Sequence, residues 1–297
     1  QGRDVKPSRA VIEGYRNFAT KLWNSARFAE MNGCVTVPGF DPRSVRLVLN
    51  KWIAHETAKA AAEVTAALEA FKFNDAAAAV YRFVWNIYCD WYVELAKPLL
   101  LGPDGADKDE TRAMTAWARD EILKLLHPFM PFITEELWAV TAGDGPGRDR
   151  MLVLAPWPQS EGLEDEEAEA EIGWVIDMIA AVRSLRAEMN ISGGAPIPLA
   201  LVDPSPQARL RADRWAGSLK RLARLSAIEV AEAAPKGSVQ LVVRGEIAAL
   251  PLAGIVDLAA ERARLAKELG KVEADIKRVD GKLGNADFIA RAPEEVV

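Results

Sequence analysis

Residues 73–98 have the sequence FNDAAAAVYRFVWNIYCDWYVELAKP, and this stretch decides the fold. A helix over Val80 to Tyr92 would have apolar residues on nearly all of its sides. A helix of that kind is buried at the centre of its domain. Asn74 can cap its start, and Pro98 follows its predicted end at Ala96, so we predict the central helix over residues 74–96.

Further helices are predicted on both sides of this segment. Apolar residues recur at steps of three and four over residues 9–31, which is typical of a helix with one buried face: Val11, Tyr15, Phe18, Leu22, Ala26 and Ala29. Asp41 and Pro42 can begin a second helix that ends near residue 71. The other predictions before residue 190 are a helix through 117–126, a break at 127–132, a short helix through 135–138, an extended segment at 151–158 and a helix over 164–189.

The pattern changes after Gly193 and Gly194. Four short apolar runs predict strands, and a basic helix separates the first two; they cover residues 197–202, 207–225 (the helix), 228–230, 239–243 and 247–252. A last helix begins near residue 257, and its apolar residues form a heptad seam: Leu258, Leu265, Leu269, Val272, Ile276, Val279 and Leu283. A seam of this length needs a partner helix. The fold class is therefore mainly α, with a helical bundle, a small α+β unit and a long coiled-coil helix.

Composition narrows the class of protein. The sequence has 297 residues with a net charge of -6, which argues against a generally basic nucleic-acid binder. Basic residues outnumber acidic ones in residues 1–60, whereas residues 161–180 contain no Lys or Arg. Only part of the surface is therefore expected to meet a polyanion. No apolar run is long enough to span a membrane, so we expect no membrane partner. No initiator Met is present, so we expect a fragment of a longer protein. The two isolated cysteines, far apart in the sequence, are typical of a cytoplasmic protein.

The sequence predicts no catalytic, cofactor-binding or metal-binding residues. Cys34 and Cys89 lie far apart without partners at metal-ligand spacing, so we predict reduced thiols in the core. The two histidines are His55 and His127, and the position of His127 before a proline favours capping or packing. We predict that five tryptophans belong to the core: Trp23, Trp52, Trp85, Trp91 and Trp138.

One face of the first helix has the side chains that unpaired RNA bases require. Asn17, Lys21, Asn24 and Phe28 follow one another at steps of 4, 3 and 4, and Arg27 flanks them. Amides read base edges, cations meet phosphates, and an exposed aromatic ring stacks on a base. The alternative is a solvated face with Phe28 tucked under a neighbouring helix.

Two later basic segments are further candidates for phosphate contacts. The basic helix at 207–225 contains Arg209, Arg211, Arg214, Lys220, Arg221 and Arg224. The heptad helix contains Lys267, Lys271 and Arg278 among other basic residues, with acidic residues near them. For both segments, a solvated face with surface ion pairs is the alternative.

Several of these segments together resemble the region C-terminal to the catalytic domain in bacterial valyl-tRNA synthetases. The stretches are YRNFATKLWNSARFAEMNG (15–33), FNDAAAAVYRFVWNIYCDWYVELAKP (73–98), LLHPFMPFITEELW (125–138), LAPWP (154–158) and VRSLRAEMN (182–190). The tail from residue 256, which includes NADFIARAPEEVV, is similar to that family's C-terminal arm. The likeness covers essentially the whole chain and is least specific at residues 195–255.

The resemblance implies a function and three domains. Residues 1–192 would be an anticodon-binding bundle, 193–255 a junction domain, and 256–297 the first helix of a coiled-coil arm whose second helix would follow Val297. The complete enzyme would attach valine to tRNA-Val with ATP and Mg, and this fragment would be inactive alone and need no cofactor. The implied partner is tRNA-Val, not DNA, and the implied state is a monomer. The predicted RNA contacts are Asn17, Lys21, Asn24, Arg27, Phe28, Lys267, Lys271 and Arg278.

Two other functions remain open at this point. The chain could be the matching region of an isoleucyl- or leucyl-tRNA synthetase. It could also be a helical interaction protein that dimerises through Leu265, Leu269 and Ile276 of the heptad helix, a property that sedimentation would detect.

Overall fold

The segment at residues 73–98 lies at the centre of the computed structural model, which describes residues 8–142, 148, 150–252 and 258–284. Three elements continue into one another there: α3 (Phe73–Arg82), the π-helical η2 (Phe83–Tyr92) and α4 (Val93–Leu100). Val80, Tyr88 and Tyr92 are almost fully buried, which confirms the predicted central helix. Its predicted ends are wrong, however, since Asn74 instead donates to Asp75 and Pro98 lies inside α4.

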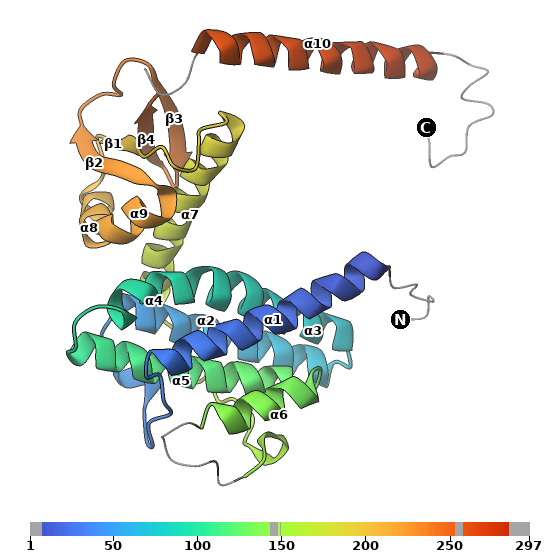
Figure 1. Cartoon of the computed structure of the whole chain (residues 1–297), viewed down its shortest axis with the longest axis vertical. Helices are drawn as coiled ribbons and strands as arrows, with labels where there is room; N and C mark the ends of the chain where they lie inside the picture. The colour runs from blue at the N-terminus through green and yellow to red at the C-terminus, as the bar shows by residue number, and fades with distance from the viewer. Residues whose placement is uncertain (1–7, 143–147, 149, 253–257, 285–297) are drawn as a thin grey trace. The chain divides into compact units, whose positions relative to one another are not determined.

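The chain folds into two compact units, unit 1 (Gln1–Ile176) and unit 2 (Asp177–Val297). The remaining elements of unit 1 are α1 (Arg9–Met31), η1 (Pro42–Ser44), α2 (Val48–Glu69), α5 (Ala106–Leu126), α6 (Pro131–Val140), η3 (Leu152–Leu154) and the first part of α7 (Glu166–Glu188) (Figure 1). The helices predicted there are confirmed, while residues 152–154 form a 3-10 turn where an extended segment was predicted. The described chain thus has the mainly α class with a small α+β unit that the sequence predicts.

The start of α2 differs from the prediction. Asp41 caps the short η1, where its carboxylate accepts the Arg43 N–H at 3.1 Å, and α2 begins only at Val48. The carboxylate of Glu110, on α5, accepts the N–H groups of Arg46 and Leu47 at 3.0 and 2.9 Å. The first amides of a helix lack partners within it, so α2 depends on a cap from another helix.

The apolar stripe of α1 is buried over only part of its length. Phe18, Leu22 and the alanines after them are buried against the bundle, as predicted. Val11 and Tyr15, which were expected on the same buried face, are 45% and 64% exposed. The first turns of α1 project past the other helices of unit 1, so no described element buries this part of the stripe (Figure 1).

Tryptophans and cysteines are distributed partly as predicted. Trp52 and Trp138 are buried core residues, but the other three predicted core tryptophans, Trp23, Trp85 and Trp91, are only half-buried. Cys34 and Cys89 are free thiols in the core, and burial raises the pKa of each to about 11. Both thiols are therefore protonated and poorly reactive at neutral pH.

Unit 2 contains a four-stranded sheet with the order β2-β1-β4-β3. Its elements are β1 (Ile197–Val202), α8 (Pro206–Arg214), α9 (Ala216–Ala223), β2 (Leu225–Ala231), β3 (Ser238–Val243), β4 (Glu246–Pro251) and α10 (Leu258–Leu283). β1 pairs parallel with β2 and antiparallel with β4. The predicted strands are confirmed, but the basic helix is split at Trp215 into α8 and α9.

α10 confirms the predicted heptad helix. The apolar residues of its seam that can be described are all 42–59% exposed: Leu265, Leu269, Val272, Ile276, Val279 and Leu283. The part of the tail resemblance at residues 285–297 lies outside the described residues. Among the helices that the structure describes, none combines the length and apolar character needed to cross a bilayer.

Candidate nucleic-acid interface

The predicted RNA-facing stripe of α1 is only partly open to solvent. Asn17, Asn24 and Arg27 are exposed, and within the described residues none of their side chains makes a hydrogen bond or ion pair. Because they are on a helix anchored by its buried face, their positions relative to one another are fixed. Two amides and a guanidinium thus point outward from a rigid element, as a site for base edges and phosphates requires.

Lys21 lies on the same face but already has partners. Its Nζ is 2.5 Å from Oδ1 of Asp90 and donates to the carbonyl oxygen of Trp85 at 3.4 Å. The ammonium also lies 3.7 Å from the centroid of the Trp85 ring. Asp90 and Trp85 both belong to η2, so the π-helical segment holds the lysine in place. A phosphate that binds Lys21 must therefore compete with a carboxylate.

The Trp85 ring over which Lys21 lies belongs to a stack of aromatic rings. The rings of Phe18 and Tyr81 are 4.8 Å apart, and those of Tyr81 and Trp85 are 5.9 Å apart and nearly parallel. Stacking and burial fix the ring on which Lys21 lies. Sequence reasoning missed Trp85 and Asp90, because nothing in the sequence indicated which residues of the central helix face α1.

Phe28 is half-buried, where an exposed ring was expected. The Nζ of Lys97, on α4, lies 5.7 Å from its centroid. The ring therefore rests partly on a neighbouring helix, which agrees in part with the alternative of a tucked Phe28. Only the open part of the ring could stack on a base.

The three basic residues predicted on α10 share one face of that helix. Lys267, Lys271 and Arg278 are all exposed, and Arg278 pairs with Asp275 at 3.0 Å. Helical geometry places this basic stripe about 150° from the apolar seam of α10. A partner helix on the seam would thus leave the stripe free to meet phosphates. On α8 and α9, Arg209 and Lys220 are exposed as well.

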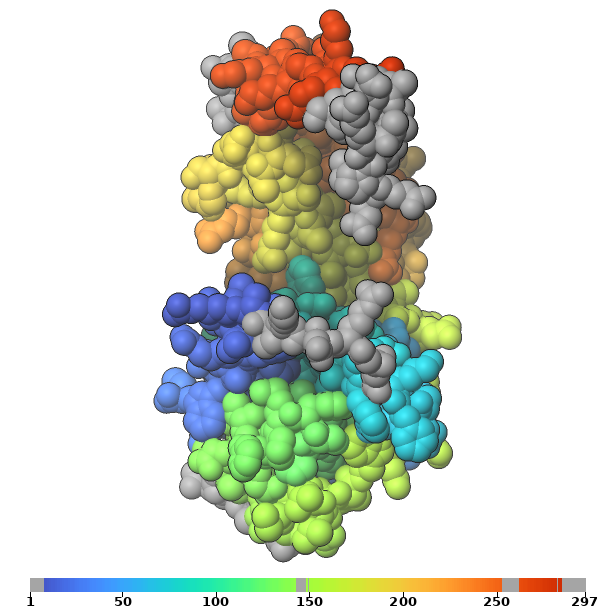
Figure 2. Space-filling view, turned by 90° about the vertical axis from the view of Figure 1, so that its right-hand side faces the viewer, coloured from blue at the N-terminus to red at the C-terminus, as the bar shows by residue number. Residues whose placement is uncertain are grey.

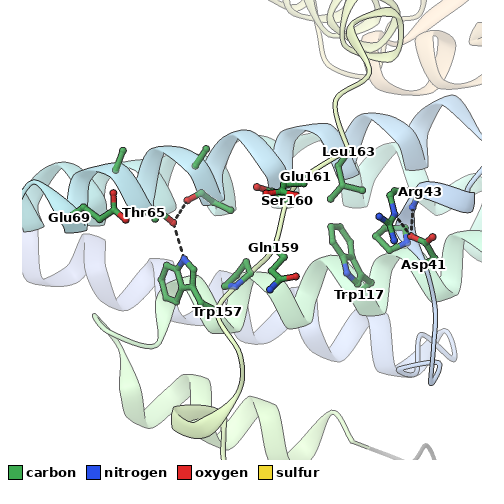
Figure 3. A pocket seen from close by; sticks show the side chains of 15 residues that line it. Asp41, Arg43, Thr65, Glu69, Trp117, Trp157, Gln159, Ser160, Glu161 and Leu163 are labelled. Atoms are coloured by element: carbon green, nitrogen blue, oxygen red, sulfur yellow. Dashed lines mark hydrogen bonds and ion pairs between the residues drawn. The ribbon is translucent and has the colours of Figure 1, made fainter.

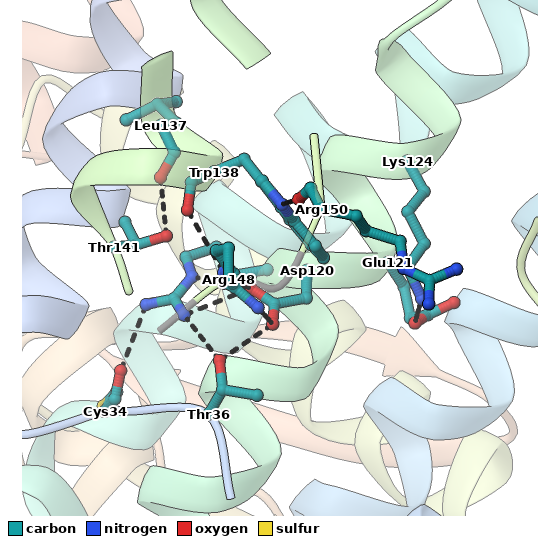
Figure 4. A network of polar contacts seen from close by, with 11 residues as sticks. Cys34, Thr36, Asp120, Glu121, Lys124, Leu137, Trp138, Thr141, Arg148 and Arg150 are labelled. Carbon is teal, nitrogen blue, oxygen red and sulfur yellow. Dashed lines mark hydrogen bonds and ion pairs between the residues drawn. The ribbon is translucent and has the colours of Figure 1, made fainter. Parts of the chain in front are cut away.

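A buried charge network lies elsewhere in unit 1. The Asp120 carboxylate accepts two hydrogen bonds of 2.9 Å from Arg148, and Arg148 lies over the Trp138 ring with Cζ 3.8 Å from its centroid (Figure 4). Arg119, which is also buried, donates to Asp120 and to the carbonyl oxygen of Cys34 at 3.1 Å. These bonds join α5 to the segment after α1 and to the end of α6. Removing one charge of such a network costs about 3–5 kcal/mol, so we assign it to stability.

A groove of about 760 Å³ in unit 1 runs between α2 and residues 157–163 (Figure 3). Trp157 donates from Nε1 to Oγ1 of Thr65 at 2.8 Å, and Arg43 is paired with Asp41 at 2.8 Å. Neither pair couples a nucleophile to a base.

One group of described residues, His55, Glu56 and Glu169, has the spacing of metal ligands. The Nδ1 of His55 accepts the Asp165 N–H at 3.0 Å, so Nε2 carries the proton of the neutral ring. That nitrogen faces Oε2 of Glu169 at 3.4 Å. A protonated nitrogen cannot bind a metal, and this geometry instead fixes the start of α7. The Nδ1 of His127 is hydrogen-bonded to Oγ1 of Thr134 at 2.9 Å and the residue is half-buried, in agreement with the predicted role in capping or packing.

Two family models match the sequence. One, described as the anticodon-binding domain of tRNA ligase, matches residues 50–201, and one described as the valyl tRNA synthetase tRNA binding arm matches residues 257–297. α1 precedes the first of these matches.

Curated relatives align with the whole chain, α1 included. The valine–tRNA ligase of Rhodopseudomonas palustris is 58% identical over 100% of this chain, which spans 34% of that protein. The valine–tRNA ligases of Bradyrhizobium diazoefficiens and Caulobacter vibrioides are 56% and 55% identical, with 34% and 33% of their lengths spanned. The chain therefore corresponds to about a third of the length of these relatives.

Proposed function

Because the chain belongs to the family of anticodon-binding domains of tRNA ligases, we propose that unit 1 binds the anticodon of tRNA-Val. The observation that carries this proposal is the open face of α1. Asn17, Asn24 and Arg27 are held outward on a helix that is anchored by its other face. Lys21 and Phe28 border this face, and we assign all five residues to RNA contact.

The chemistry of the five residues suits unpaired bases. An Asn side chain can pair bidentately with adenine, which is the middle base shared by valine anticodons. Arg27 and Lys21 supply charge for the phosphates between bases, and the open part of the Phe28 ring supplies a stacking surface. We assign adenine recognition to Asn17 or Asn24.

If the chain binds tRNA-Val, α10 is a second candidate for contact with it. We propose that Lys267, Lys271 and Arg278 contact the phosphate backbone of the tRNA away from the anticodon. Their support is the shared exposed face and the match of residues 257–297 to a tRNA-binding arm. The domains that go with these roles are residues 1–192, 193–255 and 256–297.

For the complete protein we propose the activity of its relatives, a valine–tRNA ligase that acts as a cytoplasmic monomer and uses ATP with Mg. The ATP chemistry is assigned to the part of the relatives' length that this chain does not span. We expect the chain alone to give no valine-dependent exchange of pyrophosphate into ATP, and such exchange by the pure chain would contradict this assignment.

A titration with an anticodon stem-loop of tRNA-Val tests the proposed face. We expect Phe28→Ala to weaken binding by about 1–3 kcal/mol because a stacking surface is removed. We expect Lys21→Ala to weaken binding and to reduce the slope of log K against log salt by about 0.7, the value for one phosphate contact in a single strand.

Matched substitutions elsewhere in unit 1 serve as controls. Lys51→Ala removes the same charge from α2, and Phe73→Ala removes an exposed ring from the start of α3. Both are expected to bind like the wild type, and circular dichroism checks that Phe28→Ala is folded. Equal affinity of the wild type and the four variants for the valine stem-loop would rule out the face on α1. Equal affinity of the wild type for the valine, isoleucine and leucine stem-loops would rule out tRNA-Val as the specific partner.

A further inference from the structure

The groove beside α2 is enclosed by a segment that is fixed to this helix at both ends (Figure 3). At one end, Nε1 of Trp157 donates to Oγ1 of Thr65 at 2.8 Å. At the other end, the Asp165 N–H donates to Nδ1 of His55 at 3.0 Å. We call residues 157–165 the strap. Because its first residue is held near the later position on α2, the strap runs antiparallel to the helix.

The strap is longer than the distance between its two anchors. Eight steps of chain separate Trp157 from Asp165, and they can extend over about 26 Å. The anchors on α2 are ten residues apart, which is about 15 Å along a helix. The extra length lies away from α2 and leaves the groove of about 760 Å³. The groove is therefore part of the fold and does not need a ligand to open it.

The inner surface of the groove is mostly apolar. Its floor is formed by Ala61, Ala62 and Ala66 of α2, whose short side chains leave room above them. The indole rings of Trp157, on the strap, and Trp117, on α5, also line it (Figure 3). The hydrogen bond of Trp157 fixes the orientation of its ring. A concave site of this volume with aromatic and aliphatic walls is typical of small-molecule binding.

The charged groups of the groove favour a cationic ligand. Glu69 and Glu161 line it and are exposed, and within the described residues neither carboxylate has a hydrogen bond or ion pair. Among the described lining residues Arg43 is the one cation, and Asp41 already pairs with it at 2.8 Å. This excess of negative charge repels phosphate groups. The faces of indole rings also attract ammonium groups.

The positions of the two carboxylates favour an organic cation over a metal ion. Figure 3 shows Glu69 at one end of the groove and Glu161 further along α2, with Trp157 between them. Among the described residues, the group with metal-ligand spacing is the one around His55, which does not line the groove. A ligand that meets both carboxylates must therefore have two separated positive charges. The part between these charges lies against rings and alanine methyl groups, so it should be aliphatic.

We propose that this groove binds an aliphatic diamine or polyamine. One ammonium group pairs with Glu69 and the other with Glu161, while the methylene chain lies along the Trp157 ring and the alanine floor. The strap thereby has a binding function, and its Trp157 and Pro158 belong to the LAPWP motif at residues 154–158. The proposal does not depend on RNA binding by α1.

Calorimetric titration of the chain with cadaverine, a five-carbon chain with an ammonium group at each end, tests this proposal. We expect saturable binding at one site at moderate salt. N-acetyl-lysine methylamide is the matched ligand, because it has a similar aliphatic chain but only one ammonium group. It should bind about twofold to fivefold more weakly, the range for one exposed ion pair. Equal affinity for the two ligands would contradict a site for two charges, and absence of saturable cadaverine binding would overturn the proposal.

Substitutions in the groove locate the site. We expect Glu69→Gln and Glu161→Gln each to weaken cadaverine binding by about twofold to fivefold, because one ion pair is lost. Trp157→Leu should weaken it by about threefold to tenfold, because the ring that attracts an ammonium group is removed. Circular dichroism checks that each variant is folded, and the two exposed glutamates decide the outcome if Trp157→Leu is not.

Matched substitutions on α6 serve as controls. Glu136→Gln removes an exposed carboxylate and Phe132→Leu an exposed ring, and neither residue lines the groove. Figure 2 shows α6 in green. Both controls should bind cadaverine like the wild type. Wild-type affinity in Glu69→Gln and Glu161→Gln, or equal weakening in Glu136→Gln, would show that the groove is not the site.

Discussion

At the scale of single residues, the contact between Lys21 and Asp90 has the clearest functional consequence. A lysine assigned to a phosphate is paired, in the free protein, with a carboxylate at 2.5 Å. The pair is partly exposed, so it contributes little to stability. Its effect falls on binding, because a phosphate that approaches Lys21 meets the negative charge of Asp90 as well.

We therefore expect Asp90→Asn to tighten binding of the anticodon stem-loop by about twofold to fivefold. The amide keeps the shape of the side chain but removes the competing charge. The measurement is a fluorescence titration at low and moderate salt. Asp75→Asn, which removes an exposed carboxylate at the start of α3, is the control and should leave the affinity unchanged. Weaker binding by Asp90→Asn would mean that the carboxylate positions Lys21 for RNA.

The sequence predicted this face only in part. Helical spacing was enough to bring Asn17, Lys21, Asn24 and Phe28 together, because that spacing needs only local geometry. The contacts of Lys21 with η2 join residues 64 and 69 positions apart. No local pattern contains such a pair. The half-burial of Phe28 against Lys97 was missed for the same reason.

At the scale of elements, the start of α2 depends on α5. The Glu110 carboxylate accepts the N–H groups of Arg46 and Leu47 and the amide of Asn50, the last at 3.0 Å. Burial alone would raise the pKa of Glu110, but these hydrogen bonds outweigh it and hold the pKa below its ordinary value. The ionised form is therefore favoured in the folded protein, and the ionised carboxylate stabilises the fold.

We expect Glu110→Gln to lower the free energy of unfolding by about 1.5–3 kcal/mol at pH 7, the range for hydrogen bonds to a charged group. The contribution of the wild-type carboxylate is complete above its unfolded pKa of about 4.3 and is lost as the pH falls through the lower folded value. In urea unfolding, the difference in the free energy of unfolding between the wild type and Glu110→Gln should therefore disappear at acidic pH. Glu136→Gln, an exposed control on α6, should have the same free energy of unfolding as the wild type at both pH values.

Element boundaries show the limit of sequence patterns in the same way. Asp41 and Pro42 have the form of a helix start, and they do start a helix, but only the short η1. The real start of α2 has no capping side chain of its own, since Glu110 lies about 60 residues further on. The helices and strands themselves could be predicted because burial periodicity is local, whereas a cap from another helix is not.

At the scale of the whole molecule, two surfaces are assigned to different parts of one tRNA. If α1 meets the anticodon and α10 meets the backbone elsewhere, substitutions on the two helices must have separate effects. We expect joint replacement of Lys267, Lys271 and Arg278 by Ala to weaken binding of whole tRNA-Val and to lower its salt slope by about 0.9 for each phosphate that is no longer neutralised. Binding of the isolated anticodon stem-loop should not change.

Filter binding with both RNAs at several salt concentrations checks this separation. Replacement of Arg262 and Lys277, on another face of α10, is the matched control. An equal decrease in affinity for whole tRNA and stem-loop would show that the three residues act through folding or net charge. The heptad pattern was sufficient to predict α10 itself, because its period is local, but not what covers its seam.

The backbone of Phe71 is in the left-handed region, with φ 56°. A non-glycine residue in that region costs about 1 kcal/mol. Glycine there would relax the turn and raise the free energy of unfolding by a similar amount, but it would remove a ring that is 75% exposed. Phe71 therefore leaves this turn less stable than glycine, the common residue at such a helix ending, would leave it.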